Sequence, residues 1–188
     1  MRRKLIILDL DETLIHATRE PRDDLWDFEL NVYKVYIRPY LSQFLESIIT
    51  DFDVAVWSSA SDDYVHQAVT CIFPQDYPLL FVWGRSRCTL RRQSIFDQMD
   101  FMYASDHLNY VKRLKKIKKS FGIPFYDMLI VDDTPSKSVE NYGNAIYPKA
   151  FKGEKDDAEL LLLTKYLLTL KDVENVRTIE KRYWKDEL

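Results

Sequence analysis

The chain has 188 residues, a length typical of one domain, and 46% of them are hydrophobic, which excludes a disordered chain. The formal net charge is only -3, so overall charge favours neither nucleic acid nor a membrane surface as a partner. The two cysteines, Cys71 and Cys88, form no C-x-x-C pair. This predicts the cytoplasm or another reducing intracellular compartment and no cysteine-based metal site, with a single disulfide as the less favoured alternative.

Neither a membrane span nor a secretory route is predicted. The longest apolar stretch, near residues 160–163, falls short of the ~18 residues that cross a bilayer. The apolar run near the N-terminus ends at Leu8, which is too short for the h-region of a signal peptide. The C-terminal Lys185-Asp186-Glu187-Leu188 spells an endoplasmic-reticulum retrieval signal, and without an entry signal we interpret it as coincidental.

The first predicted strand is the aliphatic run Leu5-Ile6-Ile7-Leu8, and two acids, Asp9 and Asp11, follow it. Such a run is typical of a buried strand in a parallel sheet. In open α/β sheets the ligand site lies beyond the carboxyl ends of the strands. The pair is therefore interpreted as two acids above a crevice, one able to attack while the other moves a proton. A capping or solvated turn is the alternative.

A hairpin and a helix are predicted next. Residues 28–37 partly alternate in polarity and are rich in β-formers, which indicates a hairpin turning near Asn31. Arg38 and Pro39 end it, and Pro39 at a first helical position predicts a helix to about Ile49. Its expected inward face consists of Leu41, Phe44, Leu45 and Ile48.

The middle of the chain predicts strand, helix and strand. A second buried strand covers Phe52–Trp57 and ends at Ser58. A helix over Asp62–Ile72 follows, with Ser61 as its N-cap, and Leu79–Trp83 is a short strand. We expect residues 74–109 to form a small insertion within a single domain that covers residues 1–188.

The C-terminal part is expected to alternate helices and strands. The predicted elements are a helix over residues 110–120 ended by Gly122 and Pro124, a strand Met128–Val131, a short strand over residues 144–147, and a helix over residues 157–170. Asp132 and Asp133 follow the strand that ends at Val131. This order implies an α/β fold with a parallel sheet and right-handed crossovers.

The strand ends together supply what phosphoryl transfer through a carboxylate requires. A carboxylate nucleophile forms an aspartyl-phosphate, and a second acid protonates the leaving oxygen and later activates water. A divalent cation must offset the repulsion between nucleophile and phosphate, and oxygen ligands from several strands suit Mg²⁺. A hydroxyl and a lysine can bind the remaining phosphate oxygens. The candidates are Asp9, Asp11, Ser58, Lys112, Asp132 and Asp133.

The same residues carry a family resemblance. Asp9-Leu10-Asp11-Glu12-Thr13 has the D-x-D-x-T form of haloacid-dehalogenase-type (HAD) phosphatases. Within that superfamily the chain most resembles the FCP/SCP-type branch, the NLI-interacting-factor-like phosphatases, which include enzymes acting on the RNA polymerase II C-terminal domain. Further motifs that match in chain order are Arg38-Pro39, Trp57-Ser58-Ser59-Ala60, Tyr110-Val111-Lys112 and Val131-Asp132-Asp133-Thr134-Pro135-Ser136.

The resemblance implies a role for each site residue. Asp9 would be the nucleophile and Asp11 the general acid/base. Mg²⁺ would be held by Asp9, the backbone carbonyl of Asp11, and Asp133, while Asp132 would orient Lys112 or a metal-bound water. The phosphate-binding residues would be Ser58, Lys112 and Thr13, the last of which would also brace its loop. The gap from Lys112 to Asp132 is longer than the family pattern, so Lys115 and Lys116 are alternative phosphate ligands.

The resemblance also implies the fold and the substrate. The expected fold is HAD-type and Rossmann-like, with the hairpin after the first strand and no large cap domain, which leaves an open cleft. An open cleft favours a phosphorylated protein segment, and hence a phosphoserine/phosphothreonine phosphatase. A small-molecule or nucleic-acid-end phosphatase and a non-catalytic binding module are the alternatives.

Other charged residues have weaker interpretations. The lysine-rich run at residues 112–119 is interpreted as mostly a solvated helix face, so nucleic-acid binding is not favoured. His16 is interpreted as structural or as part of the rim of the site. A basic rim for a phosphorylated segment, or a plain surface cluster, is predicted at Arg85, Arg87, Arg91 and Arg92.

Overall fold

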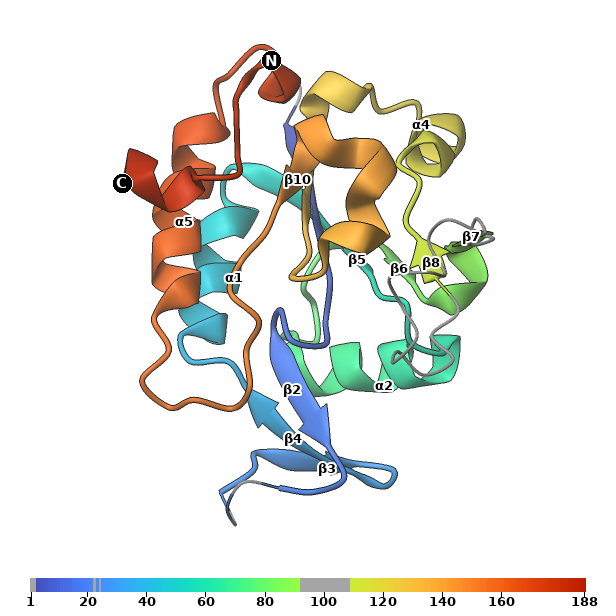
Figure 1. Cartoon of the computed structure of the whole chain (residues 1–188), viewed down its shortest axis with the longest axis vertical. Helices are drawn as coiled ribbons and strands as arrows, with labels where there is room; N and C mark the ends of the chain where they lie inside the picture. The colour runs from blue at the N-terminus through green and yellow to red at the C-terminus, as the bar shows by residue number, and fades with distance from the viewer. Residues whose placement is uncertain (1–2, 22, 24, 92–108) are drawn as a thin grey trace, which may run out of the picture.

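A five-stranded parallel sheet forms the centre of the molecule. The computed structural model describes residues 3–21, 23, 25–91 and 109–188 (Figure 1). The sheet has the order β10-β9-β1-β5-β6, and each neighbouring pair is parallel. Its strands are β1 (Lys4–Leu8), β5 (Phe52–Trp57), β6 (Leu79–Trp83), β9 (Met128–Val131) and β10 (Ala145–Ile146). The predicted α/β class and parallel sheet are confirmed.

The strands are buried on both faces, which explains their nearly unbroken apolar sequences. Ile6 and Leu8 of β1 pack in one cluster with residues of α1 (Leu41–Ile49), α2 (Asp62–Ile72) and α5 (Glu159–Leu170). Leu5 and Ile7 face the opposite side, where the cluster includes residues from α4 (Lys115–Phe121) and the loop before it. The period-2 alternation of a strand thus divides the core into two layers around the sheet.

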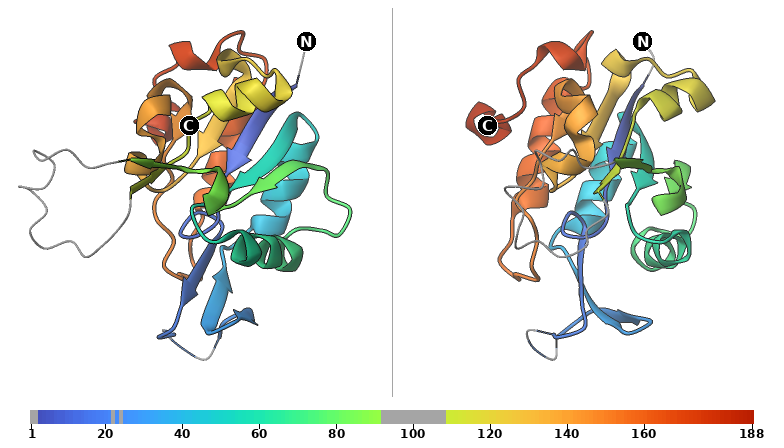
Figure 2. Two further views of the ribbon diagram at one scale, coloured as in Figure 1. Left: turned by 90° about the vertical axis from the view of Figure 1, so that its right-hand side faces the viewer. Right: turned by 45° about the vertical axis from the view of Figure 1, so that its right-hand side comes forward.

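A small antiparallel sheet follows β1 and extends from the main body (Figures 1 and 2). It has the order β2-β4-β3, formed by β2 (Ile15–Thr18), β3 (Phe28–Leu30) and β4 (Tyr33–Ile37). The predicted hairpin is confirmed as β3–β4, and Asn31 occupies the left-handed conformation at its turn with φ 55°. Strand β2 was not predicted, because His16, Ala17 and Thr18 show no apolar alternation.

Two predicted helix starts are wrong. Pro39 does not occupy a first helical position, because Tyr40 adopts a left-handed conformation with φ 66° and α1 begins at Leu41. Residues 110–112 are not helical either. Tyr110 lies in β8 (Asn109–Val111), which pairs antiparallel with β7 (Thr89–Arg91), and α4 begins only at Lys115. Pairing with β7 overrides the helical pattern that the lysine-rich run suggested.

The other predicted boundaries agree closely with the structure. Helix α2 has the predicted range, with Ser61 at its N-cap, although the Ser61 side chain forms no capping hydrogen bond. Gly122 ends α4 in a left-handed conformation. Leu41, Phe44, Leu45 and Ile48 are the buried residues of α1, as the sequence predicted. Among the described residues, no helix is both long and apolar enough to cross a membrane.

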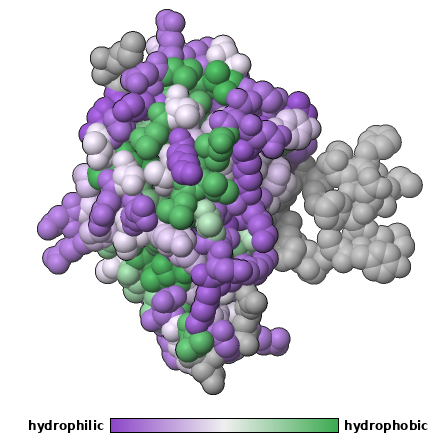
Figure 3. Space-filling model, turned by 90° about the vertical axis from the view of Figure 1, so that its left-hand side faces the viewer, coloured by the Kyte–Doolittle hydropathy of each residue, from purple (hydrophilic) through white to green (hydrophobic). Residues whose placement is uncertain are grey.

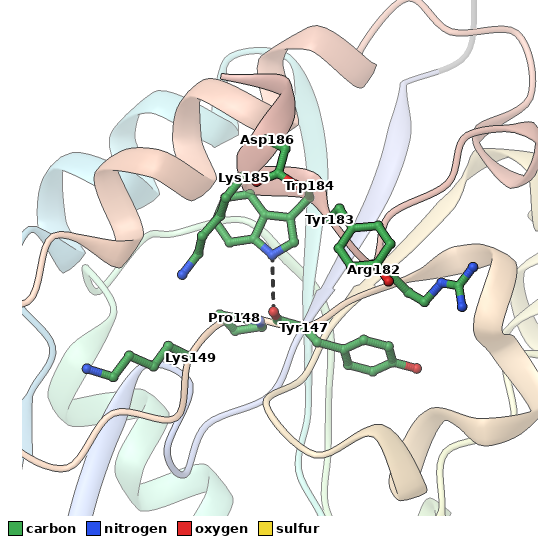
Figure 4. Close-up of a pocket in the computed structure, with 8 residues that line it drawn as sticks. All are labelled: Tyr147, Pro148, Lys149, Arg182, Tyr183, Trp184, Lys185 and Asp186. Atoms are coloured by element: carbon green, nitrogen blue, oxygen red, sulfur yellow. Dashed lines mark hydrogen bonds between the residues drawn. The ribbon is translucent and has the colours of Figure 1, made fainter.

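The C-terminal segment folds back beside the end of β10. Trp184 is buried, and its indole Nε1 donates to the carbonyl of Tyr147 at 3.1 Å (Figure 4). The two residues line a pocket of about 340 Å³ that contains none of the strand-end acids. On the face seen from the α5 side, hydrophobic and hydrophilic residues are interspersed (Figure 3).

Candidate active site

Asp9 lies at the carboxyl end of β1, the central strand of the sheet. Its backbone N–H donates to Val131 at 2.9 Å, so the parallel pairing of β1 with β9 continues to this residue. The side chain is only 1% exposed. Oδ1 accepts from Lys112 Nζ at 2.6 Å, whereas Oδ2 is buried and has no hydrogen-bond partner among the described residues. A buried carboxylate oxygen without a partner is costly, which indicates a position for a ligand.

Lys112 reaches this centre from the loop between β8 and α4. Its ammonium is fully buried and donates to Asp9 Oδ1 and to Asp132 Oδ2, the latter at 2.7 Å. Burial alone would lower the pKa of Lys112, but Asp132 and Asp9 outweigh it and hold the pKa above its ordinary value. Lys112 therefore carries its positive charge between two carboxylates.

Asp132 and Asp133 follow β9, next to β1. Asp132 is fully buried, and its Oδ1 accepts from the backbone N–H of Thr134 at 2.9 Å. The backbone N–H of Asp133 donates to Thr13 Oγ1 at 3.2 Å. Burial and the neighbouring Asp132 raise the pKa of Asp133, while Lys137 opposes the shift. The side chain of Asp132 thus binds Lys112, and the backbone of Asp133 is bonded to the loop after β1.

These acids form a set suited to a hard cation. One ligand oxygen each from Asp9, Asp132 and Asp133 lies within 4.8 Å of the others. An all-oxygen donor set with one unpartnered buried oxygen fits Mg²⁺. Such a cation would supply charge neutralisation between a carboxylate and an incoming phosphate. The Asp11 carboxylate lies outside this group, and the family resemblance assigns its backbone carbonyl, not its side chain, to the cation.

Burial changes the protonation of Asp9. It raises the pKa of this carboxyl to about 7, while the charge of Lys112 acts in the opposite direction. A nucleophilic carboxylate must be ionised, and a cation at Oδ2 would favour the ionised form. The chemistry of Asp9 is therefore linked to occupancy of the cation site.

Asp11 is held by a tyrosine that the sequence interpretation missed. Tyr64, on α2, donates its hydroxyl to Asp11 Oδ1 at 2.6 Å. Ser58 Oγ lies 3.5 Å from Asp11 Oδ2. Burial raises the pKa of Asp11, and the Tyr64 hydrogen bond partly opposes that rise. An acid with a raised pKa can both release and accept a proton, as a general acid/base requires.

Thr13 links the loop after β1 to the end of β9. Its side chain is fully buried, and its Oγ1 is occupied by the backbone N–H of Asp133. The Thr13 carbonyl accepts from the Nη1 of Arg38, another fully buried side chain, at 2.9 Å. Arg38 in turn binds both carboxylate oxygens of Asp157 at 2.9 Å. The loop that carries the catalytic candidates is thus tied to the segment before α5.

Ser58 lies at the end of β5, beside the other candidates. It is 1% exposed, and its Oγ accepts from the backbone N–H of Ala60 at 3.0 Å and donates to Asp11 Oδ2 at 3.5 Å. The structure therefore brings Asp9, Asp11, Ser58 and Lys112 to one edge of the sheet. Lys115 is exposed on α4, and Lys116 Nζ donates to the carbonyls of Arg87 and Cys88.

Three of the four arginines of the predicted basic rim belong to the described residues. Arg85 donates from Nε to the Ser59 carbonyl at 2.8 Å and lies over the Tyr110 ring. Arg87 lies over the Trp83 ring, and Arg91 is exposed. Residues 92–108, which include Arg92 and the later part of the predicted insertion, lie outside the described residues. His16 contacts Glu12 through Nδ1 at 3.1 Å, so its observed contact is with the loop after β1.

A family model matches almost the whole chain. The model of the NLI interacting factor-like phosphatases covers residues 4–177. The chain belongs to this family. The predicted family is confirmed, and with it a homology to FCP-type phosphatases of the HAD superfamily.

Curated relatives agree with the family. A probable C-terminal domain small phosphatase from Dictyostelium discoideum is 30% identical over 186 residues, with 94% of this chain and 53% of the relative covered. A human carboxy-terminal domain RNA polymerase II polypeptide A small phosphatase is 26% identical over 181 residues, with 93% and 62% covered. The chain thus spans roughly half the length of these family members.

Solved structures support the fold. A fission yeast RNA polymerase II CTD phosphatase bound to beryllium fluoride has a TM-score of 0.55 at 16% identity, with 98% of this chain and 54% of that chain covered. A haloacid dehalogenase-like hydrolase from Xanthomonas campestris also has a TM-score of 0.55, at 9% identity, with 90% and 96% covered. The HAD-like fold is confirmed, and no large cap domain is present among the described residues.

Proposed function

We propose that the chain is a Mg²⁺-dependent phosphomonoester hydrolase that acts through an aspartyl-phosphate. The observation that carries the proposal is the Asp9 carboxylate at the end of β1, with one oxygen bound to Lys112 and the other buried without a partner in the described structure. Asp132 and Asp133 complete an oxygen set around it. Membership of the phosphatase family supports the same reaction.

The proposed reaction has two displacements. An Asp9 oxygen attacks phosphorus, the bond to the ester oxygen breaks, and Asp11 donates its proton to that leaving oxygen. Water then attacks the aspartyl-phosphate, Asp11 accepts a proton from the water, and the bond between phosphorus and the Asp9 oxygen breaks. Lys112 and Ser58 bind phosphate oxygens and stabilise the charge that develops on them. Mg²⁺, when bound by the acids, reduces the repulsion between Asp9 and the phosphate.

The proposed substrate is a phosphorylated serine or threonine on a protein segment. The names of the relatives support this class, since two of them are described as C-terminal domain small phosphatases. Between β1 and α1 the described residues form the small β2-β4-β3 sheet and no further helix or strand. Such a sheet would cover the strand-end acids less than a helical cap domain would, and an open site suits a protein segment. A reducing intracellular compartment is also proposed, supported by the free thiols of Cys71 and Cys88.

One substrate panel tests this proposal. Phosphopeptides, nucleotides, sugar phosphates and 3′-phosphate oligonucleotides are compared by kcat/KM in Mg²⁺ and after EDTA treatment. We expect the highest values with phosphopeptides, loss of turnover in EDTA, and no turnover in Asp9→Asn. Higher kcat/KM with a small phosphate would refute the substrate class, and unchanged turnover in EDTA would refute the metal mechanism.

A further inference from the structure

A second lysine, Lys137, is fixed beside Lys112 by the backbone. Its carbonyl accepts the backbone N–H of Lys112 at 2.8 Å, and its own N–H donates to the carbonyl of Thr134 at 3.1 Å. It belongs to the 3-10 helical segment η3 (Pro135–Asn144), which begins two residues after Asp133. The same segment anchors Lys112 from the other side, since Asn141 Nδ2 donates to the Lys112 carbonyl. The position of Lys137 next to the strand-end acids is therefore set by the fold.

The charge of Lys137 acts on the site from this position. Burial raises the pKa of Asp9, Asp11 and Asp133, and Lys137 is among the charges that oppose the rise for each of them. Coulomb interactions between charges are weak beyond a Debye length, about 8–10 Å at physiological ionic strength. Geometry supports the same placement, because the backbone of Lys137 is bonded to that of Lys112, whose own ammonium reaches Asp9 and Asp132, so a side chain at position 137 is long enough to approach the same acids.

The ammonium groups of the two lysines differ in how many hydrogen-bond donors remain for a ligand. Lys112 is fully buried, and its ammonium is held by Asp9 and Asp132. Lys137 is half-buried and forms no ion pair with any described residue, although it lies near several acids. Its ammonium therefore has donors available for an incoming anion.

The site needs such a second cation. The acids outnumber the lysines, since four aspartates face Lys112 and Lys137, and nearby Glu12 is paired with Lys152 at 3.7 Å. A phosphate dianion entering this set is repelled even when a divalent cation is present. A lysine at the solvent side of the acids would offset that repulsion and give the phosphate a direct charge-assisted hydrogen bond.

From this geometry we propose that Lys137 is a phosphate-binding residue, whose ammonium contacts a non-bridging oxygen of the substrate phosphoryl group. The role rests on the proposed phosphatase function, because it assigns the residue to the same site. Lys112, with two of its three donors on carboxylates, keeps one donor for the phosphate and also sets the charge of Asp9, while Lys137 supplies additional affinity for the dianion.

The test compares Lys137→Ala and Lys137→Arg with Lys115→Ala, a matched control that removes an exposed lysine from α4. With p-nitrophenyl phosphate and Mg²⁺, Lys137→Ala should raise both KM and the inhibition constant of orthophosphate about 10- to 100-fold, as expected for a hydrogen bond to a charged group. Its kcat should stay within about threefold of the parent chain. Lys137→Arg should recover most of the affinity, and Lys115→Ala should match the parent.

Two results would overturn the assignment. One is an unchanged orthophosphate inhibition constant in Lys137→Ala, and the other is a fall in kcat with KM unchanged, which indicates a structural role. Calorimetric binding of orthophosphate in Mg²⁺ gives the same comparison without turnover. A failure of the proposed substrate class would change only the phosphopeptide preference, so the two failures can be distinguished.

Discussion

Removal of the Tyr64 hydroxyl tests whether Asp11 is the proton-transfer residue. Tyr64→Phe keeps the ring in place and deletes the O–H that reaches Asp11 Oδ1 at 2.6 Å. A hydrogen bond to a charged acceptor contributes about 1.5–3 kcal/mol, and each 1.4 kcal/mol corresponds to about a factor of ten. Tyr64 is only half-buried, so water can partly replace it, and we expect kcat to fall about tenfold.

The same substitution should shift the pH profile. Burial raises the pKa of Asp11, and the Tyr64 hydrogen bond opposes that rise. Without the hydroxyl the pKa rises further, so Asp11 stays protonated to a higher pH. Asp11 must be ionised to activate water in the second displacement, and that form then requires a higher pH. The acidic limb of the kcat profile should therefore move to higher pH.

The assay is steady-state hydrolysis of a phosphopeptide across pH, with two controls. Tyr77→Phe removes a comparable hydroxyl, which donates to the Leu45 carbonyl at 2.9 Å, and should cost about 1 kcal/mol of stability without changing kcat. In an Asp11→Asn background, Tyr64→Phe should have little further effect, because the two residues act as one unit. Equal kcat profiles for Tyr64→Phe and the parent chain would refute the role of Tyr64.

Two further predictions concern stability and metal binding. Arg38→Met should lower the free energy of unfolding by about 3–5 kcal/mol in urea titrations, because Asp157 is then left buried and unpaired. Burial acts against ionisation of Asp157, but hydrogen bonds from Arg38 and Glu159 hold its pKa below the ordinary value, so this contribution is present near neutrality and disappears as the pH falls through the lowered pKa. If the difference in the free energy of unfolding between Arg38→Met and the parent chain stays the same in acid, the ion-pair explanation is contradicted. For Asp9, burial raises the pKa to about 7, although the charge of Lys112 opposes the rise. Protons therefore compete with Mg²⁺ for this carboxylate. The dissociation constant of Mg²⁺, measured by calorimetry, should rise up to about tenfold per pH unit below neutrality. Constant affinity between about pH 6 and about pH 8 would exclude Asp9 as a ligand.

The central sheet could be predicted because its strands leave a simple signal. Strands buried on both faces require continuous apolar residues, and the runs that end at Leu8, Trp57 and Val131 contain little else. The acids that follow them then share one edge, since parallel strands end on the same side. Asp9, Asp132 and Asp133 were therefore expected near one another before any coordinates were known.

Tertiary contacts account for what the sequence did not reveal. The segment before α4 has a helical composition, but Tyr110 pairs with Leu90, so Lys112 approaches the site from a strand end and a loop. Tyr64 is one aromatic among many in this sequence, and only the packing of α2 brings it to Asp11. Lys137 follows the last motif within a polar stretch, and no local pattern distinguishes it from a surface lysine.

The number of residues between Lys112 and Asp132 exceeds the family pattern, which left open which lysine enters the site. The contacts of η3 explain why these extra residues do not displace Lys112. Lys137 and Asn141 hold the backbone of Lys112 on both sides, and Asn141 Oδ1 also accepts the N–H of Leu114 at 3.3 Å. The intervening residues form α4 and its return to β9, beyond these anchor points. Additional residues in α4 or in its return can therefore change the surface without moving the ammonium. The segment after Asp133 thus fixes a lysine of the candidate site that precedes it in the chain, which ties the third motif to the fourth.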